Sequence, residues 1–552
     1  MKQTTNKKLY EVHSWVGSIT AILMFIIAFT GAVSVFGDEL KVWSQSGLHR
    51  AQDISEQQIE SLALGHLQTI PTDYHKHLQI TPPHIGNVPY LVFLFEAETP
   101  ETPEGEQPDP DFKPYMAFLH DPETLALVDQ RAGTREEVLP FHSRDMSDFI
   151  TFFHADLHLG NPWGLIVTGL LGLTLLASTI TGVVIHRKII AEMFAFRARR
   201  SLRLMYADLH KVIGVWGMLF HAIIGFTGAF LGLAFVVMLP AAAYVSFGGD
   251  QDKLIETFLP ETAPEISGEY AQPQIANTLE FVAEQQDGDL LVFNLFGGTD
   301  KNALIEVITA SDSENLNVRT HKFTAADGQF VESYGELEQL GGAAKVLDLI
   351  VPLHFGNFGG IAIKVLWAVL GLSTAFLAIS GMMVWVERRT FGSKGNLSIK
   401  AYRRLSRLNI GACGGVVVAV MALFPLQRIL QDALGQPTTS LGWAFFIIWF
   451  ACIFWSMLRD NDYLTLRQLV YATAAICISV APINGLVTGN HLFNVLTHGH
   501  WTVAIINAFL LLTGVLLMRI GARMPSQRPE RLKDVATKQQ KISAEAMAVP
   551  ET

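Results

Sequence analysis

The chain has 552 residues, of which 50 % are hydrophobic and only 16 % are charged, and its mean hydropathy is +0.30. Soluble proteins carry about a quarter charged residues, so this composition predicts a membrane protein with several spans and substantial hydrophilic segments. The formal net charge of −11 does not suit nucleic-acid binding. No Cys-x-x-Cys-His motif occurs in the sequence, which excludes covalently attached c-type haem.

The sequence has eight apolar stretches that are long enough to cross a bilayer, which requires about 20 residues per helix. The first is long and lacks a convincing cleavage site, so we interpret it as a retained helix. We predict membrane helices at about 14–36, 163–185, 212–239, 361–386, 409–429, 441–458, 467–488 and 501–520.

Basic residues gather before the first span, between the second and third, and after the fourth, sixth and eighth. Loops rich in Lys and Arg face the cytoplasm, so both termini are predicted to be cytoplasmic. The same reasoning predicts a basic cytoplasmic loop at 189–211 and a disordered cytoplasmic tail at 521–552.

Two long hydrophilic segments, 40–150 and 240–350, then face outward. Each is about 110 residues long, which is enough for a small domain. Each ends in a strand–turn–strand pattern, YMAFLHDPETLALVDQ at 115–130 and RTHKFTAADGQFVES at 319–333, where apolar residues flank a turn.

An internal repeat relates the first four spans. HSWVGSITAILMFIIAFTG (13–31) aligns with HKVIGVWGMLFHAIIGFTG (210–228), and HLGNPWG…STITGVVIHRK matches HFGNFGG…LAISGMMVWVERR. The unit is helix, outward domain, helix, and both copies cross the membrane in the same sense. We predict a tandem parallel repeat with copies at 10–188 and 210–390, related by a pseudo-twofold axis along the membrane normal. Four additional spans follow in 409–520.

The repeat arranges histidines in two tiers. It places His13 opposite His210 near the cytoplasmic face and His158 opposite His354 near the outer face. Histidine is a common metal ligand, and haem iron takes axial histidines. Ionisable residues beside membrane spans point to function, and small residues such as Gly17 leave room for a flat macrocycle. Two haems, one per tier, are predicted, although glycines at this spacing also serve close helix packing.

Other histidines compete for these roles. His154 and His158 share a helix face if the helix extends that far; one would then ligate iron while the other contacts a propionate, or the pair would bind zinc or copper with Asp156. His221 lies about 16 Å deeper than His210 and competes with it for the inner iron; Met24 takes its place in the first copy. We interpret His186 as a polar cap at the membrane interface.

The motifs HSWVG, HADLHLGNPWG, DLHKVIGVW and LHFGNFGG, with turns DPETL and ADGQF, resemble the PepSY-associated transmembrane family of bacterial inner-membrane proteins linked to iron uptake and siderophore reduction. The resemblance covers about residues 10–390. It implies two periplasmic PepSY-like α+β domains on a polytopic α-helical membrane protein. It also implies b-type haems held at His13, His154 or His158, His210 and His354.

The resulting prediction is an oxidoreductase: a haem-b protein that moves electrons across the inner membrane and reduces ferric siderophore or other Fe(III) in the periplasm. No flavin or nicotinamide motif is visible, so the donor is a quinol or a cytoplasmic reductase. Two alternatives stay open: a non-catalytic PepSY-domain sensor or regulator, and a metal or siderophore transporter.

Overall fold

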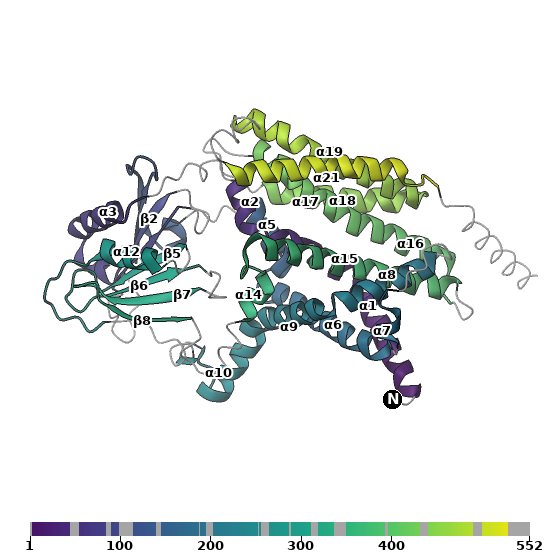
Figure 1. Ribbon diagram of the computed structural model, residues 1–552, viewed down its shortest axis with the longest axis horizontal. Helices are drawn as coiled ribbons and strands as arrows, with labels where there is room; N and C mark the ends of the chain where they lie inside the picture. Colours follow the sequence, from purple (N-terminus) through teal and green to yellow (C-terminus); the bar gives the residue numbers. More distant parts are fainter. Residues whose placement is uncertain are drawn as a thin grey trace, which may run out of the picture. The chain divides into compact units, whose positions relative to one another are not determined.

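The chain forms two compact units. One contains residues 1–37, 145–232 and 368–552, and the other contains 38–144 and 233–367. The computed structural model (Figure 1) describes residues 3–44, 54–83, 90–98, 114–139, 145–186, 188–194, 202–251, 253–254, 264–285, 289–310, 318–335, 349–391, 396–430, 440–489 and 500–527. Most of the predicted tail at 521–552 lies outside these residues.

Eight helices among the described residues are long and apolar enough to cross a membrane. Each overlaps one predicted span, which confirms their number and order. Six of them are single helices, and the third and fifth include a π-helical turn. The elements are α1 (Gln3–Ser34), α6 (Trp163–Ile185), α9 (Met218–Leu233) with η4 (Ala234–Met238) and α10 (Leu239–Phe247), α15 (Gly360–Phe391), α16 (Ile399–Asn409) with η6 (Ile410–Gly414) and α17 (Gly415–Ile429), α18 (Ser440–Leu458), α19 (Asp462–Thr488) and α21 (Trp501–Arg523).

Shorter helices flank these spans: α2 (Gly37–Ser44), α5 (Met146–Asp156), α7 (Ile189–Glu192), α8 (Leu202–Trp216) and α14 (Ile350–Phe355). The predicted loop at 189–211 therefore contains α7 and most of α8, while residues 195–201 within it lie outside the described part of the chain. Helix α8 ends before Gly217, which separates His210 from His221. A Cβ atom at position 217 would lie 2.4 Å from the His221 Cε1 atom, so only glycine fits there.

One antiparallel sheet of eight strands contains strands from both hydrophilic segments, in the order β4-β3-β2-β1-β5-β6-β7-β8. The predicted hairpins are present as β3–β4 and β7–β8. The strands are β1 (His77–Thr81), β2 (Leu91–Glu96), β3 (Tyr115–His120), β4 (Leu127–Gly133), β5 (Leu290–Phe296), β6 (Leu304–Thr309), β7 (Arg319–Thr324) and β8 (Phe330–Gly335).

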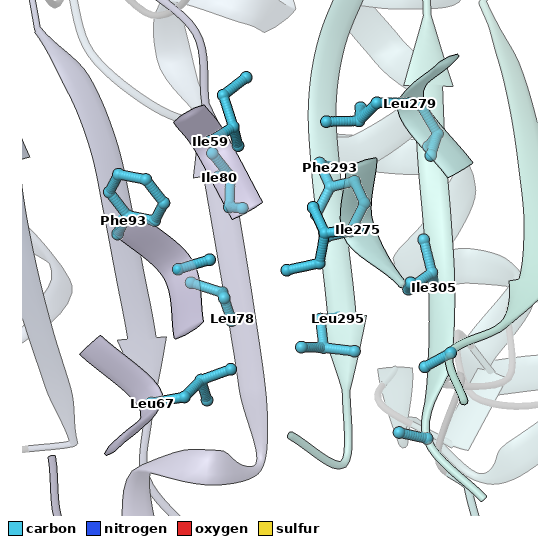
Figure 2. Close-up of a cluster of buried hydrophobic side chains, with 14 of the residues drawn as sticks. Ile59, Leu67, Leu78, Ile80, Phe93, Ile275, Leu279, Phe293, Leu295 and Ile305 are labelled. Atoms are coloured by element: carbon cyan, nitrogen blue, oxygen red, sulfur yellow. The ribbon is translucent and has the colours of Figure 1, made fainter. Parts of the chain in front are cut away.

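The sequence predicts two outward domains, whereas the structure joins their strands through the β1–β5 pair, in which Leu78 faces Leu295 and Ile80 faces Phe293. An exposed apolar edge strand can pair with strands of other chains. Pairing of β1 with β5 removes one exposed edge from the β1–β4 strands and one from the β5–β8 strands. Helices α3 (Glu56–Thr69) and α12 (Ile275–Gln285) cover the same face of the sheet. Their side chains and the inward strand residues form one hydrophobic core that runs across the junction (Figure 2).

Candidate cofactor site in the membrane helices

A cavity of about 430 Å³ lies in the membrane unit and is lined by residues of α1, α6, α8, α9 and α15. This volume is typical of small-molecule sites. Three predicted site residues, His13, His210 and His221, line it together. The tertiary fold thus brings together histidines that are up to about two hundred residues apart in the sequence.

The imidazole of His13 is fixed by α6. Its Nδ1 atom lies 3.0 Å from the Ser178 carbonyl oxygen and 3.2 Å from the Thr181 Oγ1 atom. The Thr181 hydroxyl donates to the Ala177 carbonyl at 2.7 Å, so toward His13 it accepts. Nδ1 therefore carries the proton, which leaves Nε2 as the nitrogen with a lone pair available for a metal.

His210 repeats this arrangement against α15. Its Nδ1 atom lies 3.1 Å from the Ser380 Oγ atom, and that hydroxyl donates to the Leu377 carbonyl at 3.2 Å. Ser380 precedes Gly381 just as Thr181 precedes Gly182. Because Ser380 accepts from the imidazole, His210 also carries its proton on Nδ1.

Both rings lie against a glycine of the opposing helix. A Cβ atom on Gly182 would be 3.4 Å from the His13 Cε1 atom, and one on Gly381 would be 3.1 Å from that of His210. The two ring centroids are 6.3 Å apart at an interplanar angle of 78°. Metal–imidazole bonds of about 2.0–2.1 Å place two rings on opposite sides of one ion about 6 Å apart. The observed distance between the His13 and His210 ring centroids matches this value.

His221 carries its proton on the other ring nitrogen, Nε2. Its Nε2 atom lies 3.3 Å from the Ser373 Oγ atom, whose hydroxyl donates to the Leu370 carbonyl at 2.6 Å. Nε2 is therefore the donor, and the nitrogen left over lies beside Gly217. This geometry favours His210 over His221 as the partner of His13.

His154, in the last turn of α5, shows the same anchoring against α1. Its Nδ1 atom lies 2.9 Å from the Ile27 carbonyl oxygen, and a Cβ atom on Gly31 would be 2.7 Å from its Cε1 atom. Ile27 precedes Gly31 by four residues, as Ser178 precedes Gly182. His13 and His154 thus use one type of contact: a ring on a glycine, with Nδ1 bonded to the carbonyl one turn earlier.

His158 lies beyond the end of α5. Leu157 and His158 have φ angles of 57° and 53°, and the Asp156 carboxylate accepts from the His158 backbone N–H at 2.7 Å. The His158 Nε2 atom lies 3.0 Å from the Phe149 carbonyl oxygen, and its ring centroid is 4.4 Å from that of Phe149.

The helix end has a consequence for the predicted metal pair. His154 and His158 do not share a helix face, so the condition for a helical His-x-x-x-His zinc or copper site is not met. Within the described ranges, no group of three or more His, Cys, Asp or Glu side chains could hold a metal ion.

His354 lies in the last turn of α14, as His154 does in α5. The turn after it is tight: Gly356 has a φ of +70°, and a Cβ atom there would be 2.7 Å from the Trp367 ring. Trp367 donates from Nε1 to the Leu353 carbonyl at 2.9 Å. The pairing of His354 with an outer histidine stays a prediction.

Sequence reasoning did not single out the hydroxyl residues that orient these rings, Thr181, Ser380 and Ser373. The sequence does contain a pattern that could have identified Thr181 and Ser380. They occupy matching positions of the predicted repeat, each directly before a glycine, in STITG and LAISG.

The fold and the cavity together define a multi-pass membrane protein with a histidine-lined site in its helices and a separate antiparallel sheet. The family model described as PepSY-associated TM region matches residues 10–388. The chain belongs to this family, as its motifs predict. It is similar to a Pseudomonas aeruginosa protein named "Uncharacterized protein PA4219", with 25 % identity over 389 residues that cover 67 % of this chain and 93 % of the relative.

Proposed function

We propose that the protein is a haem-b-containing electron-transfer protein that reduces ferric siderophore or other Fe(III) in the periplasm. One observation carries this proposal: His13 and His210 face one cavity from different helices, and each is oriented through Nδ1. Axial haem histidines commonly have this arrangement, with one nitrogen hydrogen-bonded and the other available to iron.

The surrounding residues fit a flat macrocycle. Gly17 and Gly214 each follow a cavity histidine by four residues and line the cavity. A Cβ atom on Gly17 would meet no described atom within 4 Å, and one on Gly214 would meet only the Leu377 side chain at 3.9 Å. No hydrogen bond within the described part of the chain involves the Nε2 atom of His13 or His210. Haem supplies one-electron chemistry when it is bound there.

A second haem in the outer tier is part of the proposal. His354 is the histidine predicted for the second copy, opposite His158, with His154 as the competing ligand on the first copy. The contact of the His154 ring with Gly31 supports His154. His158 is less suited because its Nε2 atom bonds to Phe149.

The parallel repeat is likewise proposed, with copies at 10–188 and 210–390. The matched Thr181–Gly182 and Ser380–Gly381 contacts support it. So does the sheet, in which each half consists of one helix followed by four strands, α3 with β1–β4 and α12 with β5–β8. The two segments at about 40–150 and 240–350 would then be PepSY-like parts in the periplasm.

The proposed direction of transfer rests on the distribution of basic residues, which predicts that both termini are cytoplasmic. The donor would be a quinol or a cytoplasmic reductase. Reduction in the periplasm would release iron, because Fe(II) binds the hard oxygen ligands of siderophores more weakly than Fe(III) does.

The test is an absorption spectrum of the detergent-purified protein, oxidised and then reduced with dithionite, with a pyridine haemochrome assay. About two b-type haems per chain are expected, as the two tiers imply. Reduced protein should then be reoxidised by a ferric siderophore in stopped-flow mixing. A colourless protein from haem-replete cells would overturn the redox function and favour the sensor or the transporter.

A further inference from the structure

Two unpartnered ring nitrogens line the same cavity as the histidine pair. They are the Nε2 atom of His186, at the end of α6, and the Nε1 atom of Trp385, in α15. Both atoms are buried, and neither has a hydrogen-bond partner among the residues that the structure describes. Buried polar atoms are almost always paired, and an unpaired one is costly. Their presence indicates an acceptor that binds from the cavity.

The two positions correspond in the repeat. His186 follows Gly182 by four residues, and Trp385 follows Gly381 by four. Each nitrogen therefore belongs to a residue one helical turn, about 6 Å along the axis, beyond the glycine that supports a cavity histidine. The two helices thus each present one buried ring nitrogen at this position. The indole N–H is a donor, and His186 is a donor in the tautomer that carries its proton on Nε2.

The pattern of two donors matches the chemistry of haem b, which carries two propionate carboxylates on one edge. We propose that His186 and Trp385 each donate a hydrogen bond to one of these carboxylates. This inference rests on the proposed function, because it assigns the orientation of the inner haem within the same cavity. An indole N–H can only donate, so Trp385 suits an acceptor such as a carboxylate.

Of the neighbouring charges, Arg389 supports an anionic group at this end, whereas Lys211 is already paired with two carboxylates. The Lys211 side chain also lines the cavity; its Nζ atom bonds to Glu192 at 2.7 Å and lies 3.4 Å from the buried Asp208. Arg389 lies over the Trp385 ring, 5.6 Å from its centroid, and Trp15 packs edge-on against it at 5.4 Å. These contacts hold the indole in place, and carboxylates removed from water require such donors and nearby cations.

The experiment measures haem loss from the purified full-length protein. Trp385→Phe and His186→Leu each delete one donor, and we expect each to speed haem transfer to apomyoglobin about tenfold, as for loss of a hydrogen bond to a charged group. His186→Gln, which keeps a donor, should restore slow loss. Trp216→Phe is the matched control, because the Trp216 indole donates to the Met193 carbonyl at 3.2 Å.

A second measurement isolates the carboxylates themselves. Apoprotein is loaded with haem or with haem dimethyl ester, whose carboxylates are blocked. Wild-type protein should retain haem at least tenfold longer than the ester, whereas the Trp385→Phe/His186→Leu double variant should retain both equally. An unchanged preference for haem in the double variant, with a normal Soret band, would overturn the inference and leave the haem function intact. A wild-type protein that binds neither compound would overturn both.

Discussion

The described part of the chain contains two close histidine pairs, which differ in which ring nitrogen is free to bind a metal. In the membrane unit, His13 and His210 are held through Nδ1 and have ring centroids 6.3 Å apart. In the sheet, His66 of α3 and His120 of β3 have their Nε2 atoms 2.8 Å apart. The two histidines near the sheet are hydrogen-bonded to each other, whereas His13 and His210 both line a cavity.

The hydrogen bonds of the sheet pair determine its protonation. His120 donates from Nδ1 to the Leu125 carbonyl at 2.7 Å, so its Nε2 atom accepts the proton of His66. The His66 ring also stacks on Phe118 with centroids 4.0 Å apart. Burial, together with the neighbouring His120, lowers the pKa of His66 to about 4. Proximity alone therefore does not identify metal ligands; the partner of the second nitrogen does.

The largest predicted effect is on haem content, which should depend on the membrane histidine pair and not on the sheet pair. His13→Ala or His210→Ala should abolish the inner haem and halve the haem content, because an axial ligand is lost. His66→Ala should leave the haem content unchanged. A pyridine haemochrome assay on the three purified variants decides the matter. Full haem content in both membrane variants would assign the iron to other ligands.

A second prediction concerns cavity space rather than ligands. Gly17→Phe places a ring where a Cβ atom meets no described atom within 4 Å, so the apoprotein should fold normally. The same ring should fill the cavity and reduce inner haem binding at least tenfold. Thermal unfolding of the apoprotein and haem titration measure the two effects. Gly65→Phe, in α3 and outside the cavity, is the matched control, because a Cβ atom there also meets no described atom within 4 Å.

The spans, the hairpins and the family could be predicted from the sequence, since each leaves a local pattern of hydropathy or turn residues. The sheet junction could not, because His77–Thr81 is a short strand and nothing local identifies Leu290–Phe296 as its partner. The histidine positions were visible, but their tautomers depend on which hydroxyl faces them across the helix contact. The end of α5 before His158 depends on the left-handed Leu157, a conformation unusual for leucine.

A smaller effect is expected from the residues that orient the rings. Ser380→Ala removes the hydroxyl that accepts from His210, and Thr181→Val removes its counterpart at His13. Loss of such a supporting contact typically costs about tenfold or more in affinity. The reduction of haem affinity should be similar in the two variants, because His13 retains the Ser178 carbonyl at 3.0 Å and His210 retains a hydrogen bond to the Leu377 backbone. Equal affinities in wild type and both variants would show that the hydroxyls have no orienting role.

The smallest effect is a pH dependence confined to the sheet pair. The pKa of His66 is about 4 in the folded protein and near 6.5 when unfolded, so the unfolded chain binds more protons between these values. The free energy of unfolding should fall as the pH drops from about 6.5 to about 4, by roughly 1–2 kcal/mol once solvent screening of this partly exposed ring is allowed for. Hydrogen exchange of β3 amides in the full-length protein at several pH values measures this. His66→Leu should flatten the profile; an identical slope in wild type and variant would show that His66 does not govern it.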